Sequence, residues 1–506
     1  MNEAQTRKRK IDVSLSKLSW NIVPYKIGLN TSVLSAHAVE EYPTTNGPAD
    51  YALFVQGKLL AIIEAKKSGV GALNVLEQAK RYAKGVVHSV GRWGEYMVPF
   101  LFSANGEQMY FLDVRNPINT SRKIENFYSP AALWEFYNRD YTTAFKWLKE
   151  NEIDNPFLRP YQVKAITAFE DAVIEGKRKM MLAMATGTGK TFTSANLIYR
   201  LLKSKTAKRI LFLVDRKALA AQAATAFAAF ETPSGNKLNQ EYEMFSQRFK
   251  KEDLDEGQKF DVSVLPNEYL TKPDATKTFL YVCTIQRMAI NLLGKDAVFN
   301  GDDEDDESDA DKLNIPIHAF DVIIADECHR GYTSSETNVW RYVLDYFDAI
   351  KLCLTATPAM HTISYFNKPT YRYTVNEAVL DGFLVDYDAV KIKSNVRIKG
   401  VFLKEGEQVG KLDTESGQLK IEGLEDERAF DASDVERKIT APDSNRKIVA
   451  EIAKYALEFE KEKGHFPKIL FFASNDISNR SHADDQLNPR FGYQAEYSYL
   501  VIFRIS

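Results

Sequence analysis

Five short apolar runs between residues 179 and 358 constrain the fold of this chain more than any other feature. They are KMMLAMAT, RILFLVD, FLYVCTI, FDVIIADE and IKLCLTATP, and helical stretches separate them. The runs are rich in aliphatic and β-branched residues and lack polar alternation. Such runs suit strands that are buried on both faces of a parallel sheet. We therefore predict an α/β fold for this part of the chain.

The first run ends in MATGTGKT, residues 184–191, and the apolar helical stretch FTSANLIYRLL follows directly. A glycine-rich turn between a strand and a helix is the setting of a phosphate-binding loop. We expect backbone N–H groups to face the phosphates of ATP, Lys190 to reach the β and γ phosphates, and the Thr191 hydroxyl to ligate Mg²⁺. Met184 replaces the first glycine of the usual pattern, and a chance glycine turn is the alternative. The residues assigned to ATP binding are Gly187, Thr188, Gly189, Lys190 and Thr191.

An acidic pair ends the fourth run, in VIIADECHR. We expect Asp326 to hold the magnesium ion through water and Glu327 to orient or deprotonate the attacking water. The alternative is that both acids only cap the next helix, where acidic residues are common. Their place at the carboxyl end of an apolar strand favours the magnesium site.

Four further segments agree with these two in order and spacing. LRPYQVKAI offers Gln162, whose amide suits hydrogen bonding to the adenine edge of ATP. LVDRKALAAQ and VCTIQRM follow strands and supply candidates for gripping a nucleic-acid backbone, namely Arg216, Thr284, Gln286 and Arg287. LTATP supplies Thr355 and Thr357, small hydroxyls suited to coupling the nucleotide site to nucleic acid. The combination resembles superfamily 2 helicases and DNA translocases, which implies two RecA-like domains with ATP between them.

The segment PADYALFVQGKLLAIIEAKK, residues 48–67, predicts a β-hairpin with charged residues at its open end. With the turn centred on Gly57, Asp50 lies opposite Glu64. Alternation along the strand puts Glu64 and Lys66 on one face. Two carboxylates held close together repel each other unless a divalent cation lies between them. We therefore expect Mg²⁺ there, with Lys66 assisting phosphodiester cleavage; an exposed turn with surface charges is the alternative.

The hairpin resembles the core of PD-(D/E)xK nucleases, in which the two acids and the lysine carry the catalysis. The helical stretch LNVLEQAKRYAKGVV follows and places Gln78 and Tyr82 on one face. This pair matches a QxxxY element of type I restriction subunits, which implies a supporting role at the nuclease site. Glu41, in VEEYPT, is a candidate for a further acid, from a preceding helix or loop.

The hairpin, the motor motifs and EAVLDGFLVDY together resemble the restriction (R) subunit of type I restriction-modification systems. The resemblance covers roughly residues 30–475. It implies a PD-(D/E)xK endonuclease domain over residues 1–150, a first RecA-like helicase domain over 151–375, and a linker with an incomplete second RecA-like domain over 376–506. KILFFASNDIS resembles the fourth helicase motif, and the later motifs do not follow it, so we expect a truncated chain.

The same resemblance implies a type I site-specific deoxyribonuclease that uses ATP and Mg²⁺. Its implied activities are translocation along double-stranded DNA and cleavage of unmodified DNA. Its implied partners are the modification (methyltransferase) and specificity subunits. Two alternatives stay open: a truncated remnant that binds DNA or ATP without turnover, and a superfamily 2 helicase acting on RNA or DNA. The acidic hairpin disfavours the helicase alternative.

Composition sets wider limits on the chain of 506 residues. The net charge of −3 carries little weight, because a DNA-binding groove can coexist with an acidic exterior. The three cysteines form no CxxC pair, which argues against a zinc site or a disulfide framework. No apolar run approaches the roughly 20 residues that cross a bilayer, so we expect a cytoplasmic protein without membrane contact. The acidic stretch NGDDEDDESDAD is expected to be a solvated surface insertion.

Overall fold

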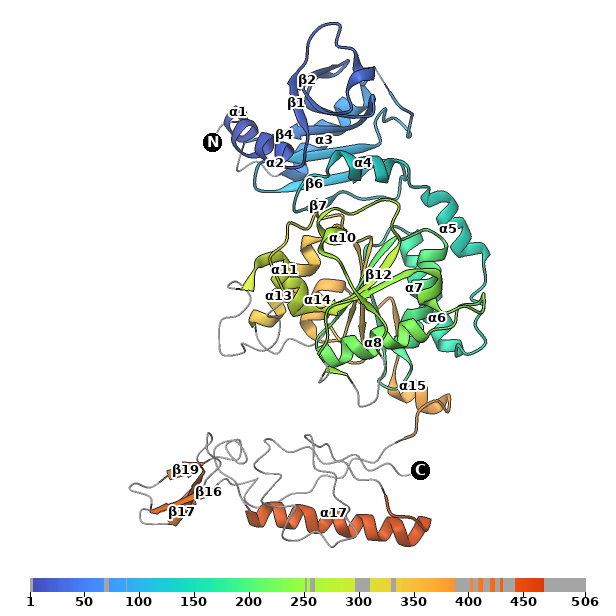
Figure 1. The fold of residues 1–506 in the computed structure, drawn as a ribbon, viewed down its shortest axis with the longest axis vertical. Helices are drawn as coiled ribbons and strands as arrows, with labels where there is room; N and C mark the ends of the chain where they lie inside the picture. The colour runs from blue at the N-terminus through green and yellow to red at the C-terminus, as the bar shows by residue number, and fades with distance from the viewer. Residues whose placement is uncertain are drawn as a thin grey trace. The chain divides into compact units, whose positions relative to one another are not determined.

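The computed structural model describes residues 3–67, 72–87, 89–250, 253–254, 260–295, 310–328, 334–386, 401–403, 408–412, 419–423, 428–430 and 442–467. The chain forms two compact units, Met1–Asp381 and Gly382–Ser506 (Figure 1). The acidic stretch at 300–309 and the segment KILFFASNDIS lie outside the described residues, as does the tail that follows it.

Seven strands of the first unit form a mixed sheet in the order of the sequence, β1 to β7. The pairs β1–β2 and β4–β5 are parallel, and the other neighbours are antiparallel. The predicted hairpin is the β3–β4 pair. The strands are β1 (Asn21–Pro24), β2 (Ala36–Thr44), β3 (Gly47–Val55), β4 (Lys58–Ala65), β5 (Phe100–Ala104), β6 (Met109–Asp113) and β7 (Arg122–Ile124).

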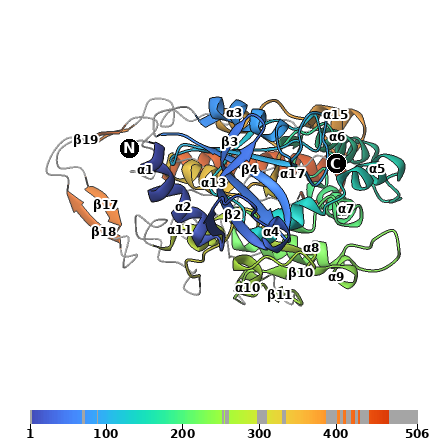
Figure 2. The same cartoon turned by 90° about the horizontal axis from the view of Figure 1, so that it is seen from above.

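Helices cover both faces of this sheet, because its central strands are apolar on both sides. Leu76, Ala79 and Ala83 of α3 (Ala72–Lys84) are buried against one face. On the other face, Ile11 and Leu15 pack with residues of β3 and β4. They belong to a continuous N-terminal helical segment of α1 (Glu3–Thr6), η1 (Arg7–Ile11) and α2 (Asp12–Lys17). Figure 2 shows α2 and α3 on opposite sides of β3 and β4.

The five apolar runs form strands of a second sheet, as predicted from their composition. Its eight strands are ordered β11-β10-β12-β9-β13-β14-β8-β15, and every neighbouring pair is parallel. The runs themselves are β8 (Lys179–Met184), β9 (Arg209–Val214), β12 (Phe279–Thr284), β13 (Val322–Asp326) and β14 (Ile350–Thr355). The outer strands are β10 (Glu243–Ser246), β11 (Ser263–Val264) and β15 (Tyr371–Tyr373).

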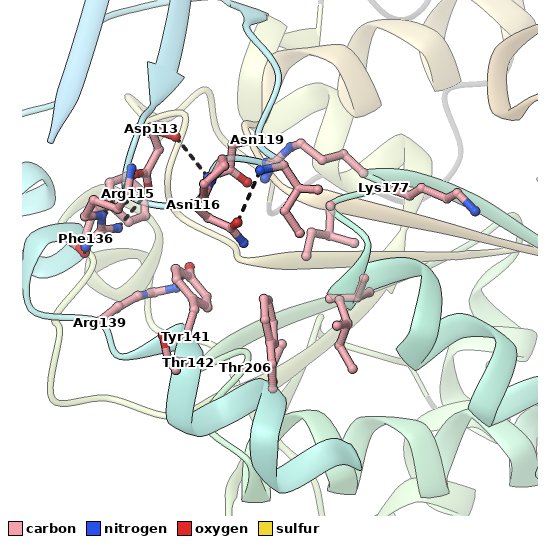
Figure 3. Close-up of a pocket in the computed structure, with 18 of the residues that line it drawn as sticks. Asp113, Arg115, Asn116, Asn119, Phe136, Arg139, Tyr141, Thr142, Lys177 and Thr206 are labelled. Carbon is pink, nitrogen blue, oxygen red and sulfur yellow. Dashed lines mark hydrogen bonds and ion pairs between the residues drawn. The ribbon is translucent and has the colours of Figure 1, made fainter. Parts of the chain in front are cut away.

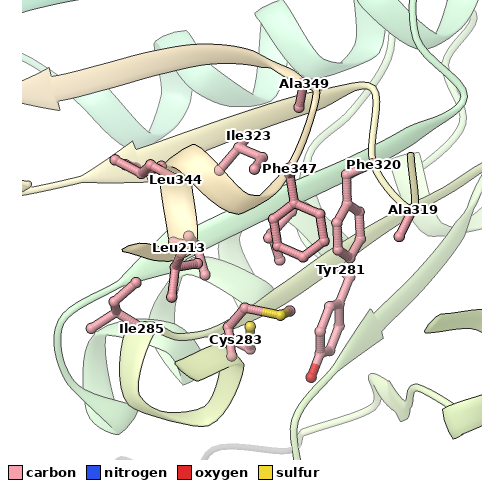
Figure 4. Close-up of a cluster of buried hydrophobic side chains, with 14 of the residues drawn as sticks. Leu213, Tyr281, Cys283, Ile285, Ala319, Phe320, Ile323, Leu344, Phe347 and Ala349 are labelled. Atoms are coloured by element: carbon pink, nitrogen blue, oxygen red, sulfur yellow. The ribbon is translucent and has the colours of Figure 1, made fainter. Parts of the chain in front are cut away.

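Helices also lie on both sides of the second sheet (Figure 1), so its central strands are fully enclosed. Figure 4 shows one of the resulting cores, where Phe320 and Phe347 meet the strand residues Tyr281 and Cys283. The larger helices of this part are α6 (Pro160–Ile174), α7 (Lys190–Lys203), α8 (Lys217–Ala229), α11 (Ile285–Leu293) and α13 (Ser334–Tyr346). Shorter helices are α9 (Leu238–Glu241), α10 (Asn267–Thr271), α14 (Met360–Phe366) and α15 (Val375–Leu380).

Two helices, α4 (Pro130–Tyr137) and α5 (Tyr141–Glu150), connect the two sheets. The second unit contains the helix α17 (Pro442–Lys463). This unit also contains the antiparallel pairs β16 (Val401–Leu403) with β19 (Arg428–Phe430) and β17 (Gln408–Leu412) with β18 (Leu419–Gly423). Within the described residues, no helix has the length and apolar character that crossing a bilayer requires.

The two sheets of the first unit share a contact region at the amino ends of the parallel strands. Ile317, which precedes β13, is buried in the same apolar cluster as Phe102 and Tyr128 of the first sheet's core. Arg122 of β7 forms a two-pronged ion pair with Asp348, with Nε–Oδ1 at 2.6 Å and Nη2–Oδ2 at 2.7 Å. Arg178 also donates to Asp348, at 2.9 Å. The first sheet is thus fixed to the second by apolar and charged contacts.

A second buried charge cluster lies beside the first. Glu135 of α4 accepts from Arg209, the first residue of β9, at 3.0 Å, and Arg139 contacts Asp321 at 2.7 Å. Arg139 and Arg209 hold the pKa of Asp321 well below its usual range, although burial acts in the opposite direction. A cavity of 810 Å³ lies next to these clusters. Figure 3 shows side chains that line it. Its arginines pair with acids of the same contact region, for example Arg115 with Asp113 at 2.8 Å.

Candidate functional sites

The predicted phosphate loop joins the end of β8 to the start of α7. Gly187 and Gly189 have φ angles of +82° and +78°, a left-handed conformation that glycine adopts without a Cβ penalty. A Cβ added to Gly189 would lie 2.6 Å from Nε2 of Gln162. The Met184 side chain is buried at the end of β8, so the loop turns without a glycine at that position. The geometry is that of a loop whose backbone can cradle phosphate at a helix N-terminus.

Gln162 is buried against this loop from α6. Its Nε2 donates to the backbone oxygens of Thr188 at 3.0 Å and Gly189 at 3.3 Å, and its Oε1 accepts from the backbone N–H of Arg159 at 2.9 Å. The amide therefore braces the loop in this structure. Its contact with the adenine edge stays a prediction.

The acidic pair at the end of β13 faces the same loop. Glu327 Oε1 lies 3.3 Å from Nζ of Lys190, and Asp326 Oδ1 accepts from the backbone N–H of Glu327 at 3.0 Å. Glu327 has a φ of +52°, a costly conformation for a side chain with a Cβ. Strained backbone of this kind clusters at active sites. The structure thus brings the lysine of the loop and both predicted acids together at the carboxyl ends of β8 and β13.

The four residues predicted to contact nucleic acid differ in how exposed their side chains are. Arg216 is exposed after β9, and Gln286 is half-buried in the first turn of α11. Thr284 is buried and caps α11, accepting from the backbone N–H of Arg287 at 3.2 Å, and Arg287 is buried as well. Their contact with DNA stays a prediction.

The predicted coupling hydroxyls lie at the end of β14. Thr355 is fully buried, and its Oγ1 accepts from the backbone N–H of the exposed Thr357 at 3.2 Å. One hydroxyl thus faces the interior and the other the surface, at the same sheet edge as the phosphate loop.

The expectation that the cysteines form no disulfide is wrong for one pair. Cys328, just beyond β13, is bonded to Cys353 of β14, with the two Cα atoms 6.2 Å apart. The sequence does not show this because the pairing depends on the register of neighbouring strands, in which Ala325 lies beside Cys353. Cys283 is buried and takes no part in this disulfide.

The hairpin pairs in the predicted register near its open end. Tyr51 lies opposite Ile63 and Leu53 opposite Ala61, and a bulge shifts the register only closer to the turn. Asp50 and Glu64 follow these pairs. Oδ2 of Asp50 accepts from the backbone N–H of Ala65 at 2.6 Å. The carboxyl group of Asp50 is therefore held at the end of β4, directly beside Glu64.

Glu64 and Lys66 lie on one face of β4, as the alternation of side chains predicts. Lys66 Nζ is 2.9 Å from Glu64 Oε1, whereas Ala65 packs in the core of the opposite face. Glu64 is almost fully buried, so its charge depends on neighbouring groups rather than on water. The predicted supporting pair is also formed, since Gln78 Nε2 donates to the Tyr82 hydroxyl at 2.9 Å on α3.

Glu41 lies in strand β2, and not in a helix or loop as expected. The ladder pairs Glu40 with Tyr51 and Tyr42 with Ala49, so Glu41 and Asp50 face each other between these pairs. Glu41 has a φ of +50°, which marks a local break in the strand. The sequence did not show the strand because EEYP breaks the apolar alternation.

Sequence reasoning missed Arg7, which lies among these acids. Its Nη1 donates to Asp50 Oδ1 at 3.0 Å and to Glu41, and its Nη2 lies 3.5 Å from Glu40 Oε1. Burial opposes its charge, but hydrogen bonds to Glu41 and Tyr51 and the charge of Asp50 raise the pKa of Arg7 above its ordinary value. The only signal in the sequence was the basic stretch RKRK near the N-terminus.

The side chains at the open end of the hairpin fit a divalent cation. Carboxylate oxygens are the ligands that Mg²⁺ prefers, and it commonly binds through one or two of them together with water and phosphate oxygens. Asp50 and Glu64 supply such a pair, and a cationic guanidinium already lies against Asp50. In the part of the chain that the structure describes, no group of three or more His, Cys, Asp or Glu side chains forms a ready metal site. The donor set is therefore a two-carboxylate one.

Comparisons with known proteins assign both parts of the first unit. Residues 155–360 match the family model described as the res subunit of type III restriction enzymes. Residues 21–137 match the model for the second domain of the type I restriction enzyme EcoKI endonuclease subunit.

Two curated relatives come from Escherichia coli. The chain is 30% identical over 510 residues to the type I restriction enzyme EcoKI endonuclease subunit, a match over 88% of this chain and 40% of the relative. It is 30% identical over 448 residues to the EcoAI endonuclease subunit, covering 85% of this chain and 46% of the relative. The chain thus spans less than half the length of either relative.

A fragment structure of a putative HsdR subunit of a type I restriction enzyme from Vibrio vulnificus is 21% identical. That alignment has a TM-score of 0.29 and covers 76% of this chain and 62% of the other.

The parallel sheet with its phosphate loop and acidic pair places this part of the chain in a class of protein, the helicase-like ATP-binding motors. The sequence matches over both domains narrow this class. The chain belongs to the family of type I restriction endonuclease subunits.

Proposed function

We propose that this chain carries the motor and nuclease functions of a type I restriction subunit. It would translocate double-stranded DNA with ATP hydrolysis and cleave unmodified DNA with Mg²⁺, in the cytoplasm and in complex with modification and specificity subunits. The observation that carries the proposal is the convergence of Asp50, Glu64 and Lys66 in the same folded unit as the phosphate loop. A helicase that only unwinds nucleic acid has no use for this cluster.

On the motor side, the phosphate loop would hold the nucleotide. Backbone N–H groups of the loop and Lys190 bind the phosphates, and Thr191 and Asp326 are suited to the magnesium ion that accompanies ATP. Glu327 Oε1 lies 3.3 Å from Nζ of Lys190. When phosphate engages the lysine, the carboxylate of Glu327 is released to orient the attacking water.

On the nuclease side, Asp50 and Glu64 would hold Mg²⁺, which activates water and stabilises the leaving oxygen of a phosphodiester. Asp50 is fixed by the backbone N–H of Ala65, so its orientation does not depend on the metal. Lys66 donates to Glu64 and is only partly exposed, which places its ammonium where it can neutralise charge that develops on the phosphate. The Gln78–Tyr82 pair borders the same face.

The test is DNA cleavage by the full chain, co-expressed with modification and specificity subunits from the same system, with Mg²⁺ and ATP. Removing a preorganised charge-stabilising group costs about 100-fold or more in rate, so Lys66→Ala should lose at least that much cleavage. Lys67 is the neighbouring exposed lysine, so Lys67→Ala is the matched control and should keep wild-type cleavage. Lys190→Ala should abolish ATP hydrolysis. Equal cleavage by the Lys66 and Lys67 variants would refute the nuclease assignment.

A further inference from the structure

The cation next to the predicted metal ligands is a side chain of this protein. Arg7 lies on the N-terminal helical segment and reaches the open end of the hairpin, where a single nitrogen, Nη1, contacts both Asp50 and Glu41. Its Nη2 donates to the backbone oxygen of Asp50 at 3.3 Å. The guanidinium also lies over the ring of Tyr51, 4.9 Å from the ring centroid. These contacts fix the guanidinium in one place.

Charge at this site is unevenly balanced. Glu40, Glu41, Asp50 and Glu64 supply four carboxylates, and Arg7 and Lys66 supply two cations. The backbone is distorted at Glu41, which lies opposite Asp50 with a φ of +50°. Because the Arg7 side chain is mostly buried, with 14% of its surface exposed, water screens its charge only in part.

We propose that Arg7 is an internal competitor of the divalent cation at the nuclease site. The inference rests on the proposed nuclease function and adds a residue that sets how tightly the metal is held. A divalent ion on Asp50 and the guanidinium on the same carboxylate repel each other over a short distance. Metal binding therefore has to weaken the contact between Arg7 and Asp50. Glu40 and Glu41 lie where they can keep the displaced guanidinium.

This arrangement links the metal to the N-terminal helical segment. Arg7 begins η1, and Ile11 of the same element is buried in the core of the first sheet. When the guanidinium leaves Asp50, the segment loses one of its anchors to the hairpin while its apolar anchor remains. The affinity of the nuclease site for the divalent ion would therefore stay low as long as the Arg7 guanidinium remains on Asp50.

The test is binding of Mn²⁺, used as the probe for the divalent ion, to the full chain without nucleotide. Site-specific binding is defined as the part that Asp50→Asn abolishes. Arg7→Gln removes the competing charge and should tighten that part by about tenfold or more. Arg9 is an exposed arginine of the same helical segment, so Arg9→Gln removes the same charge away from the acids and should change it less than about twofold.

A second measurement needs no variant. In the wild-type chain, amide hydrogen exchange over residues 7–17 should become faster when Mn²⁺ binds, because the segment loses its contact with Asp50. Slower or unchanged exchange would contradict the competition.

The outcomes separate the two proposals. Equal or weaker Mn²⁺ binding by Arg7→Gln, with binding still dependent on Asp50, overturns the role of Arg7 and leaves the nuclease function standing. No Asp50-dependent binding in any variant overturns both.

Discussion

The ion pair between Arg122 and Asp348 should be a main attachment of the first sheet to the second. Arg122 is on β7 and Asp348 precedes β14, so the pair crosses from one sheet to the other. Both prongs are short, at 2.6 and 2.7 Å, and the side chains are 20% and 5% exposed. The perturbation is a double-mutant cycle of Arg122→Ala and Asp348→Ala.

The expected loss in free energy of unfolding depends on which charged groups each single variant leaves without a partner. Breaking a buried pair costs about 3–5 kcal/mol when an uncompensated charge remains. Asp348→Ala leaves Arg122 and Arg178 without their shared acid and should reach that range. Arg122→Ala leaves Asp348 with Arg178, at 2.9 Å, and with the Tyr128 hydroxyl, and should cost less. We expect a coupling free energy of about 2–3 kcal/mol.

The assay is urea unfolding of the full chain, followed by tryptophan fluorescence, because Trp20 reports on the first sheet and Trp340 on the second. The control cycle uses Lys123 of β7 and Glu125, which follows the strand. They form an exposed pair at 2.9 Å, for which about 0–1 kcal/mol is expected. A coupling energy for Arg122 and Asp348 that is no larger than that of the control would refute the reasoning.

Three further predictions concern single positions. Burial lowers the pKa of His318 to about 4. Between about pH 6.5 and 4 the unfolded chain therefore takes up a proton that the folded chain does not. The free energy of unfolding should decrease as the pH is lowered through this window. In the His318→Phe variant this decrease should be smaller by up to about 3 kcal/mol, as measured by unfolding at a series of pH values. Gly189→Ala should weaken binding of an ATP analogue by about tenfold or more, because the added Cβ would lie 2.6 Å from Nε2 of Gln162. Gly235 has a similar φ and open space around it, so Gly235→Ala is the control and should leave binding unchanged. Phe102→Ala should lower the free energy of unfolding by about 3–5 kcal/mol, measured by urea titration, since Phe102 is fully buried among aromatic rings.

The strands and helices that follow from local chemistry were predictable from the sequence. The five apolar runs had to be buried on both faces, and all five are parallel strands of one sheet. The hairpin register followed from its turn, with Tyr51 opposite Ile63, although the bulge near the turn did not. The pairing of Gln78 with Tyr82 followed from helical spacing alone.

Features that depend on distant segments were not predictable. Arg7 reaches Asp50 across more than forty positions of sequence, and no periodicity links them. Cys328 and Cys353 meet only because β13 and β14 are neighbours in a particular register. In strand β2, Glu41 has a left-handed backbone conformation. The apolar alternation is broken around this residue, so the sequence pattern did not predict the strand. In each case the contact depends on the tertiary fold, and local sequence propensity carries no information about it.

The attachment of the first sheet at the amino ends of the parallel strands has a consequence for distance along DNA. Arg178, Arg209, Asp321 and Asp348 all lie at or just before the starts of their strands, whereas the phosphate loop lies at the opposite edge. These contacts should hold the first sheet in a fixed position relative to the second sheet. Under the proposed function, scission should then fall at a constant offset from the place where the second sheet's domain holds the duplex, whatever the surrounding base sequence.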